Sequence, residues 1–282
     1  MNKDFRIVAG ILKKYNGQST EIRIPEGVLE IDNCLPHTMS SLYIPKGIKY
    51  FDYEVKNPEI NRRYFKKVIF EDVETLCDIE YEVTNIHYMI GTPIQVAKDT
   101  YIEDELLTEI SIPQGVESIR EYAFAGCRSL KKVTIPGSVK EIGFFAFGDC
   151  ENLEEVIIED GVERIREYAF WNCKNLKKVN VSESIKRIEY SAFENCESLL
   201  SILIPDRMTF IHVDTFKGCK SLSSVRLGKN ISRIEIGAFE GCSSLKEIEF
   251  PKSMKEYYDN AFYKCSENFH ILGKKNCKKL KD

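Results

Sequence analysis

Seven of the ten cysteines lie at a constant spacing, and cysteine is a residue type whose spacing can indicate metal or redox chemistry. They are 23 residues apart, at Cys127, Cys150, Cys173, Cys196, Cys219, Cys242 and Cys265. No zinc or redox motif has this period, whereas a structural repeat produces it automatically. Stacked repeats would hold equivalent Cβ atoms about 5 Å apart, beyond the ~3.8 Å usual in a disulfide. We therefore expect buried thiols that pack as small apolar side chains.

Other residues with chemical potential form no recognised pattern. Cys265, His270 and Cys277 are metal-ligand types without a second pair at zinc spacing. The four histidines are in unrelated contexts, at His37, His87, His212 and His270. There is no phosphate-binding glycine loop and no catalytic signature, although a Ser-His-Asp site could still assemble in space. The sequence predicts no catalytic residue, metal site or cofactor, and a hydrolase with a cryptic site is kept as a second alternative.

Composition excludes several classes of protein. The 282 residues carry 40 Lys+Arg against 44 Asp+Glu, a net charge of −4 that disfavours nucleic-acid binding. No stretch approaches the roughly 18 apolar residues that a membrane span needs, so membrane insertion is not expected. The charged N-terminus, from Met1 to Arg6, lacks the apolar run of an export signal. Cytoplasmic localisation is the expectation, unless a leader was removed before this numbering begins.

The cysteines belong to seven repeats without insertion, and each repeat begins at a leucine. These are Leu107, Leu130, Leu153, Leu176, Leu199, Leu222 and Leu245. With the leucine as position 1, positions 4, 6, 10 and 13 are apolar in every repeat apart from Tyr257 in the last. The alternation at positions 4 and 6 predicts a short strand with one buried face, and positions 10 to 13 predict a second one. One such unit cannot enclose a core, so the units must stack as coils of a solenoid.

The end of each repeat reads Ala-Phe-x-x-Cys, as in Ala146 to Cys150, and its three-residue spacing favours a helical turn. The Phe column at position 18 is invariant, whereas Thr215 replaces Ala in the fifth repeat. The whole pattern, almost complete from Leu130 to Cys150, resembles the BspA-like family of leucine-rich repeats. The resemblance implies an α/β, mostly β, right-handed solenoid with a parallel concave sheet, short second strands and single helical turns outside. It also implies protein binding, adhesion included, and a location at the cell surface.

Three regions are expected within one continuous domain. Residues 1–106 would form an N-terminal cap with degenerate repeats, including Ile22 to Val28, Leu42 to Ile48 and Val68 to Phe70. A hairpin is expected over Phe5 to Tyr15, and residues 77–100, which have no repeat phase, would form a longer loop-bearing coil. Residues 107–267 hold the seven regular repeats, and residues 268–282 would form a C-terminal cap.

Charged residues alternate in sign along the outward positions of the first strands. Position 3 carries Glu109, Lys132, Glu155 and Lys178 in successive repeats. Opposite charges on adjacent strands stabilise each other, so we interpret this column as a self-paired charge ladder that sets register. The aromatic column at position 16, Tyr122, Phe145 and Tyr168 beside Trp171, is either packing or a binding strip, and packing is preferred.

The charge ladder ends at the fifth repeat, where Leu200 and Leu203 take outward positions. Ile157 lies in the column of Leu203, and Phe210 lies on the second strand of the same repeat. An apolar centre with a charged rim is the usual anatomy of a protein interface, so these four residues are the candidate partner-binding site. The leading function is therefore a non-enzymatic protein-interaction module with a protein partner. The alternative is an intracellular scaffold or assembly subunit.

Overall fold

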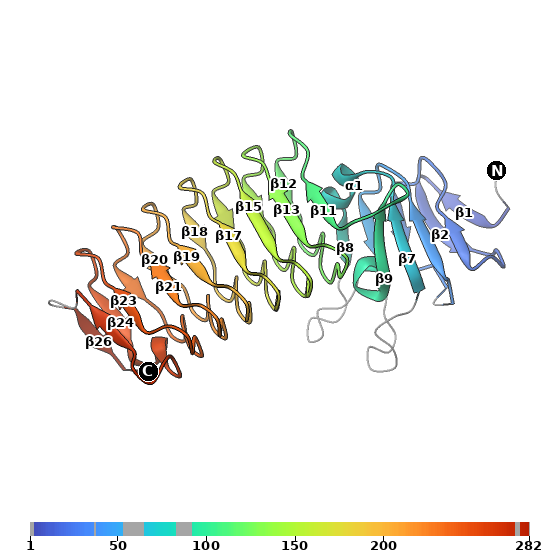
Figure 1. Cartoon of the computed structure of the whole chain (residues 1–282). Coiled ribbons are helices and arrows are strands. Elements are labelled where there is room, and N and C mark those ends of the chain that lie inside the picture. The colour runs from blue at the N-terminus through green and yellow to red at the C-terminus, as the bar shows by residue number, and fades with distance from the viewer. Residues whose placement is uncertain (1–2, 37, 53–64, 83–91, 274–276, 282) are drawn as a thin grey trace.

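The computed structural model describes residues 3–36, 38–52, 65–82, 92–273 and 277–281 (Figure 1). The chain is a solenoid whose coils stack from the N-terminal end of a rod to its C-terminal end. Parallel pairing between coils gives the rod two sets of sheets, one from the first strand of each coil and one from the second. His37, His87 and the unphased residues 83–91 lie outside the described residues.

The N-terminal region begins with an antiparallel hairpin at the segment where the sequence predicts one. One five-stranded sheet contains β1 (Phe5–Val8), β2 (Ile11–Tyr15), β4 (Glu30–Asp32), β6 (Tyr50–Asp52) and β8 (Glu80–Glu82). The other contains β3 (Glu21–Arg23), β5 (Ser41–Ile44), β7 (Phe65–Phe70), β9 (Ala97–Ile102) and β10 (Glu105–Leu106). The helices α1 (Val73–Asp78) and α2 (Pro93–Val96) lie between strands of this region. The strands β8 and β9 keep parallel register with β6 and β7, so the segment without repeat phase still contributes to both sheets.

The first strands of the regular coils form what we call the first sheet. Its members are β11 (Glu109–Ser111), β13 (Lys132–Ile135), β15 (Glu155–Ile158), β17 (Lys178–Asn180), β19 (Ser201–Leu203), β21 (Ser224–Arg226), β23 (Glu247–Glu249) and β25 (His270–Leu272). The ladder is interrupted after β17 and again after β21. Paired residues are 23 apart, as where Glu109 lies opposite Lys132, because the repeats contain no insertion.

The second strands form what we call the second sheet. Its members are β12 (Ser118–Ile119), β14 (Glu141–Ile142), β16 (Arg164–Ile165), β18 (Arg187–Ile188), β20 (Phe210–Ile211), β22 (Arg233–Ile234), β24 (Glu256–Tyr258) and β26 (Lys278–Leu280). This ladder is interrupted once, after β18. The C-terminal strands β25 and β26 continue the parallel stacking onto β23 and β24. Residues of the expected C-terminal cap therefore add one more coil.

The core is a set of columns that run along the rod. The position-18 Phe rings stack nearly parallel, with centroids 4.8 Å apart for Phe124 and Phe147 and 5.2 Å apart for Phe147 and Phe170. Leu, Val, Ile and Ala side chains of the repeat surround this column and are almost completely buried. Each coil thus covers the apolar edge of the next, as the repeat arithmetic requires.

The repeat cysteines form a second column, and all ten cysteines of the chain are free thiols. Six of the seven are buried, and Cys265 near the end is partly buried. Each thiol from Cys150 onward donates to the carbonyl oxygen of the Phe in the preceding coil, as from Cys173 to Phe147 at 3.1 Å. Burial raises the pKa of Cys173 well above its usual value, so this thiol stays protonated. The cysteines are therefore hydrogen-bond donors between coils as well as small core residues.

The outer segment of each coil is a tight turn. Its hydrogen bonds join residues three apart, as from the Cys150 amide to the Phe147 carbonyl at 3.2 Å. Positions 16 and 20 adopt left-handed backbone angles, including φ 52° at Phe145 and φ 59° at Asn172. These residues interrupt any continuous helix, and only the last regular coil forms a 3₁₀-helix here, η1 (Asp259–Phe262). Phe145 is fully buried, Tyr122 nearly so, and Tyr168 is partly buried against the core, hence the position-16 aromatic residues serve mainly as packing.

Candidate protein-interaction surfaces at the fourth and fifth coils

The alternating charges of the first sheet satisfy one another in the second to fourth coils. The Glu155 carboxylate lies between Lys132 Nζ at 3.0 Å and Lys178 Nζ at 2.7 Å. Hydrogen bonds from Lys178 and Lys132 lower the pKa of Glu155. Glu109 lies opposite Lys132 in the ladder but makes no ion pair within 4 Å among the described residues. These side chains form ion pairs with one another, so little unpaired charge remains for a ligand in this part of the sheet.

The fifth coil presents Leu200 where the three preceding coils present charged residues, and Leu203 where the fourth coil presents Asn180. Leu200 is 54% exposed and Leu203 is 38% exposed, and both lie on or beside β19 of the first sheet. Leu203 also lines a hollow of about 680 Å³ together with Arg226, Leu227 and Glu249. We call Leu200, Leu203 and this hollow the leucine surface.

The structure does not bring the four candidate residues into one patch. Ile157 is only partly exposed on β15, and the Asn180 rung separates it from Leu203. Phe210 is 43% exposed but lies on β20, in the second sheet. The turn from Pro205 to Met208 runs between β19 and β20, so the candidate site divides into two surfaces on different sheets.

Both sheets are interrupted at the same boundary, between the fourth and fifth coils. Thr215 is buried there in the column that is otherwise alanine, and its hydroxyl donates to the His212 carbonyl at 2.8 Å. The Phe193 and Phe216 rings are 5.7 Å apart, the widest spacing in the Phe column. Thr adds two heavy atoms to a close-packed column. The Phe239 and Phe262 rings, in coils that keep alanine at this position, are 5.5 Å apart. Thr215 in an alanine column was the sequence signal for this boundary.

We predict that the amides of Thr209 and His212 exchange with solvent deuterium faster than their counterparts one coil later. The Ser232 and Glu235 amides donate to carbonyls of the fifth coil at 2.8 and 2.9 Å. Among the described residues, the amides of Thr209 and His212 donate no equivalent hydrogen bond to a carbonyl of the fourth coil. Amides without a cross-strand acceptor open at lower free energy. Residue-resolved hydrogen exchange measures this, and equal protection at the four amides would contradict it.

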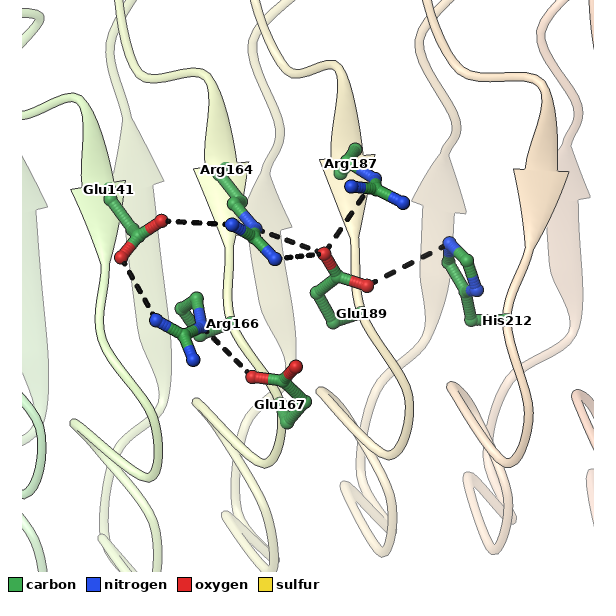
Figure 2. A network of polar contacts seen from close by, with 7 residues as sticks. All are labelled: Glu141, Arg164, Arg166, Glu167, Arg187, Glu189 and His212. Atoms are coloured by element: carbon green, nitrogen blue, oxygen red, sulfur yellow. Dashed lines mark hydrogen bonds and ion pairs between the residues drawn. The ribbon is translucent and has the colours of Figure 1, made fainter.

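A network of charged side chains covers the second sheet in the second to fifth coils (Figure 2). Glu141 accepts from Arg164 at 3.5 Å and from Arg166 at 3.3 Å, and Arg166 also contacts Glu167 at 2.9 Å. Its members occupy three positions of their repeats. Position 12 holds Glu141, Arg164 and Arg187, position 14 holds Arg166, Glu189 and His212, and position 15 holds Glu167. The alternating charges at position 3, which belong to the first sheet, gave no indication of this network.

Glu189 is the most buried charged group of this network, with 9% of its side chain exposed. Its Oε1 atom accepts from Arg164 at 2.9 and 2.6 Å, and Arg187 Nε lies 3.7 Å from the same oxygen. The other carboxylate oxygen lies 3.9 Å from His212 Nε2, across the boundary between the fourth and fifth coils. One carboxylate therefore serves two arginines and a histidine.

The described residues show no grouping of three or more His, Cys, Asp or Glu side chains arranged to bind a metal. His212 belongs to the charge network, and His270 lies on β25 opposite Glu247. Among the same residues, no helix has the length and apolar character to cross a bilayer.

Two stacked parallel sheets, a Phe column and a 23-residue register define a leucine-rich-repeat solenoid. The sequence model of the BspA type leucine rich repeat region, with six copies, matches residues 95–223 and 210–282. The chain belongs to this family, so the family and the fold expected from the sequence are confirmed.

Solved structures with similar folds are also bacterial leucine-rich-repeat proteins. The T. pallidum protein TpLRR is 29% identical over 62% of this chain and 71% of its own, with a TM-score of 0.44. A leucine-rich repeat protein of Bacteroides ovatus is 18% identical, and the match covers 96% of this chain and 85% of that protein with a TM-score of 0.43. A leucine rich cell surface protein of Faecalibacterium prausnitzii is 22% identical, and the match covers 95% of this chain and 92% of that protein with a TM-score of 0.42. No protein with a curated description matches the chain.

Proposed function

We propose that this chain is a non-enzymatic protein-binding module and that its partner contacts the leucine surface of the first sheet. The observation that carries the proposal is the change at the fifth coil, where a self-paired charge ladder gives way to two exposed leucines. Singly exposed leucines are ordinary on a protein surface. Two of them in one coil, beside a hollow in the same sheet, form the apolar centre that an interface requires.

The surroundings of the leucine surface have the character of an interface rim. Lys177 pairs with Glu154 at 2.8 Å on the preceding coil, and Lys229 pairs with Asp206 at 2.7 Å beside the hollow. Charges that are already paired can stay solvated at the edge of a complex and need no partner of their own. Binding energy would then come from burial of Leu200 and Leu203, with a partner side chain in the hollow.

The expected test result is that Leu200→Asp combined with Leu203→Asp abolishes partner capture and leaves the unfolding midpoint nearly unchanged. The full chain serves as bait in an extract of its source cells, prey are quantified by mass spectrometry, and the purified prey is then titrated calorimetrically. Burying two carboxylates in an apolar contact should weaken binding by about a hundredfold or more. The matched control is Leu29→Asp with Leu106→Asp, two leucines exposed to 50% and 42% in the N-terminal region.

Equal loss with the control pair would contradict the proposal, and so would a large drop in the unfolding midpoint. The family resemblance implies adhesion to another cell's proteins, whereas a scaffold would bind a partner of its own cell. Fractionation of native cells with protease shaving separates these two roles. Hydrolytic turnover abolished by His212→Ala or His270→Ala would replace the binding proposal with a cryptic active site.

A further inference from the structure

Arg187 is the arginine with the weakest ion pairing in the network of the second sheet (Figure 2). Its side chain is 59% exposed, and its one carboxylate contact among the described residues is the 3.7 Å approach to Glu189 Oε1. That oxygen already accepts two shorter bonds from Arg164. Arg166, by contrast, contacts two carboxylates, at 3.3 and 2.9 Å. The network is therefore electrostatically positive at its Arg187 end.

The strands on either side of Arg187 offer it no further carboxylate. Arg164 lies opposite it on β16, a like charge in the same rung. On the other side the equivalent position is Phe210, and the sheet is interrupted before β20. An arginine with free N–H groups at the end of an interrupted sheet can accept a carboxylate from outside the chain.

Exposed apolar side chains follow this arginine by three residues in the fourth coil and occupy the equivalent position in the fifth. Tyr190 is 42% exposed and packs edge-on against Tyr168, with centroids 5.3 Å apart and planes at 88°. Val213 is 38% exposed one coil later, where its carbonyl accepts from the Ser191 amide at 3.0 Å. With Phe210, these residues place exposed apolar and aromatic side chains on the fourth and fifth coils, at the Arg187 end of the network. Arginine and tyrosine are the residue types that contribute most at interfaces.

We propose that Arg187, Tyr190, Phe210 and Val213 form a second docking surface, which binds a protein segment carrying a carboxylate side chain beside a large apolar one. The carboxylate would complete the ion pairing of Arg187, and the apolar side chain would cover Tyr190, Phe210 and Val213. A single negative charge fits better than a phosphate, because a phosphate of about −1.5 to −2 charge would lie close to the Glu189 carboxylate. This surface belongs to the second sheet and does not depend on the leucine surface.

The test is a selection of random 12-residue displayed peptides on the full chain, with parallel selections on the R187Q and F210S variants. We expect clones that need both residues to be enriched in Asp or Glu next to Leu, Ile, Phe, Tyr or Trp. A synthetic peptide from this set should bind about tenfold more weakly to R187Q, and replacing its acidic residue by the amide should cause the same loss. The two changes together should cost little more than either alone.

R6Q is the matched control, because Arg6 is exposed on β1, makes no ion pair within 4 Å among the described residues and belongs to neither surface. The same peptide should bind R6Q and the variant with Leu200→Asp and Leu203→Asp as it binds the original chain. Loss with R6Q, no loss with R187Q, a preference for phosphorylated over acidic peptides, or the absence of Arg187-dependent clones would each overturn the proposal. None of these results bears on capture through the leucine surface, so the two proposals fail separately. Unchanged unfolding midpoints verify that R187Q and F210S remain folded.

Discussion

Phe170→Ala is expected to lower the free energy of unfolding by about 3–5 kcal/mol, the usual range for truncation of a buried aromatic side chain. Phe170 is fully buried, and its ring stacks on Phe147 and on Phe193 with centroids 5.2 Å apart on each side. The cavity would lie between the stacked rings of the two adjacent coils, and these rings cannot close it without shifting a whole coil. Chemical denaturation followed by circular dichroism measures the loss.

Phe262→Ala is the matched control for this prediction. Phe262 stacks on Phe239 at 5.5 Å and on Phe269 at 4.8 Å, but it remains partly exposed near the end of the array. Less apolar surface is lost to water there, and the terminal coil can relax more freely, hence a smaller loss is expected. Equal losses at the two positions would contradict a stack whose stability depends on neighbours on both sides.

Glu189→Gln is expected to destabilise the chain by about 1–3 kcal/mol, the range for leaving a charge-assisted network short of its acceptor. The glutamine would keep the shape of the side chain and remove its charge. Arg164 and Arg187, which lie opposite each other on adjacent strands, would then repel without a carboxylate between them. The effect should be largest at low salt, because Arg187 is exposed and its repulsion is screened by ions.

Glu163→Gln provides the comparison, since Glu163 also pairs with a cation on the next coil. Its carboxylate lies 2.7 Å from Lys186 Nζ, but both side chains are about half exposed. Ion pairs that are exposed to water contribute little to stability, so the unfolding free energy should change little. Denaturation of both variants at two salt concentrations tests the difference, and a loss at Glu163 as large as that at Glu189 would show that burial is not the deciding factor.

The two proposed docking surfaces both lie at the interruption between the fourth and fifth coils. In a regular ladder the charged side chains pair with one another and the backbone groups are hydrogen-bonded between strands, so few polar groups remain for a partner to bind. Where the ladder stops, leucines are exposed on the first sheet, and an incompletely paired arginine is exposed on the second. We infer that departures from the repeat, more than the repeat itself, give this solenoid its binding specificity.

The sequence by itself determined the period, the strands of each coil, the Phe column and the family. It could do so because seven uninterrupted copies must place equivalent residues on top of one another, and Glu109 therefore lies opposite Lys132 in the structure. The periodic pattern also located the fifth coil as exceptional, through Leu200, Leu203 and Thr215.

Only the tertiary structure decided which of those exceptional residues share a surface. Phe210 follows Leu203 by a few residues, yet the turn between them carries it to the other sheet. The shared carboxylate of Glu189 joins residues of three coils, and the distances between them depend on how the coils twist and on where a sheet is interrupted. A repeat pattern specifies the column in which a side chain lies. The spacing along that column is set by packing of the whole stack, and it ranges from 4.8 Å between Phe124 and Phe147 to 5.7 Å between Phe193 and Phe216.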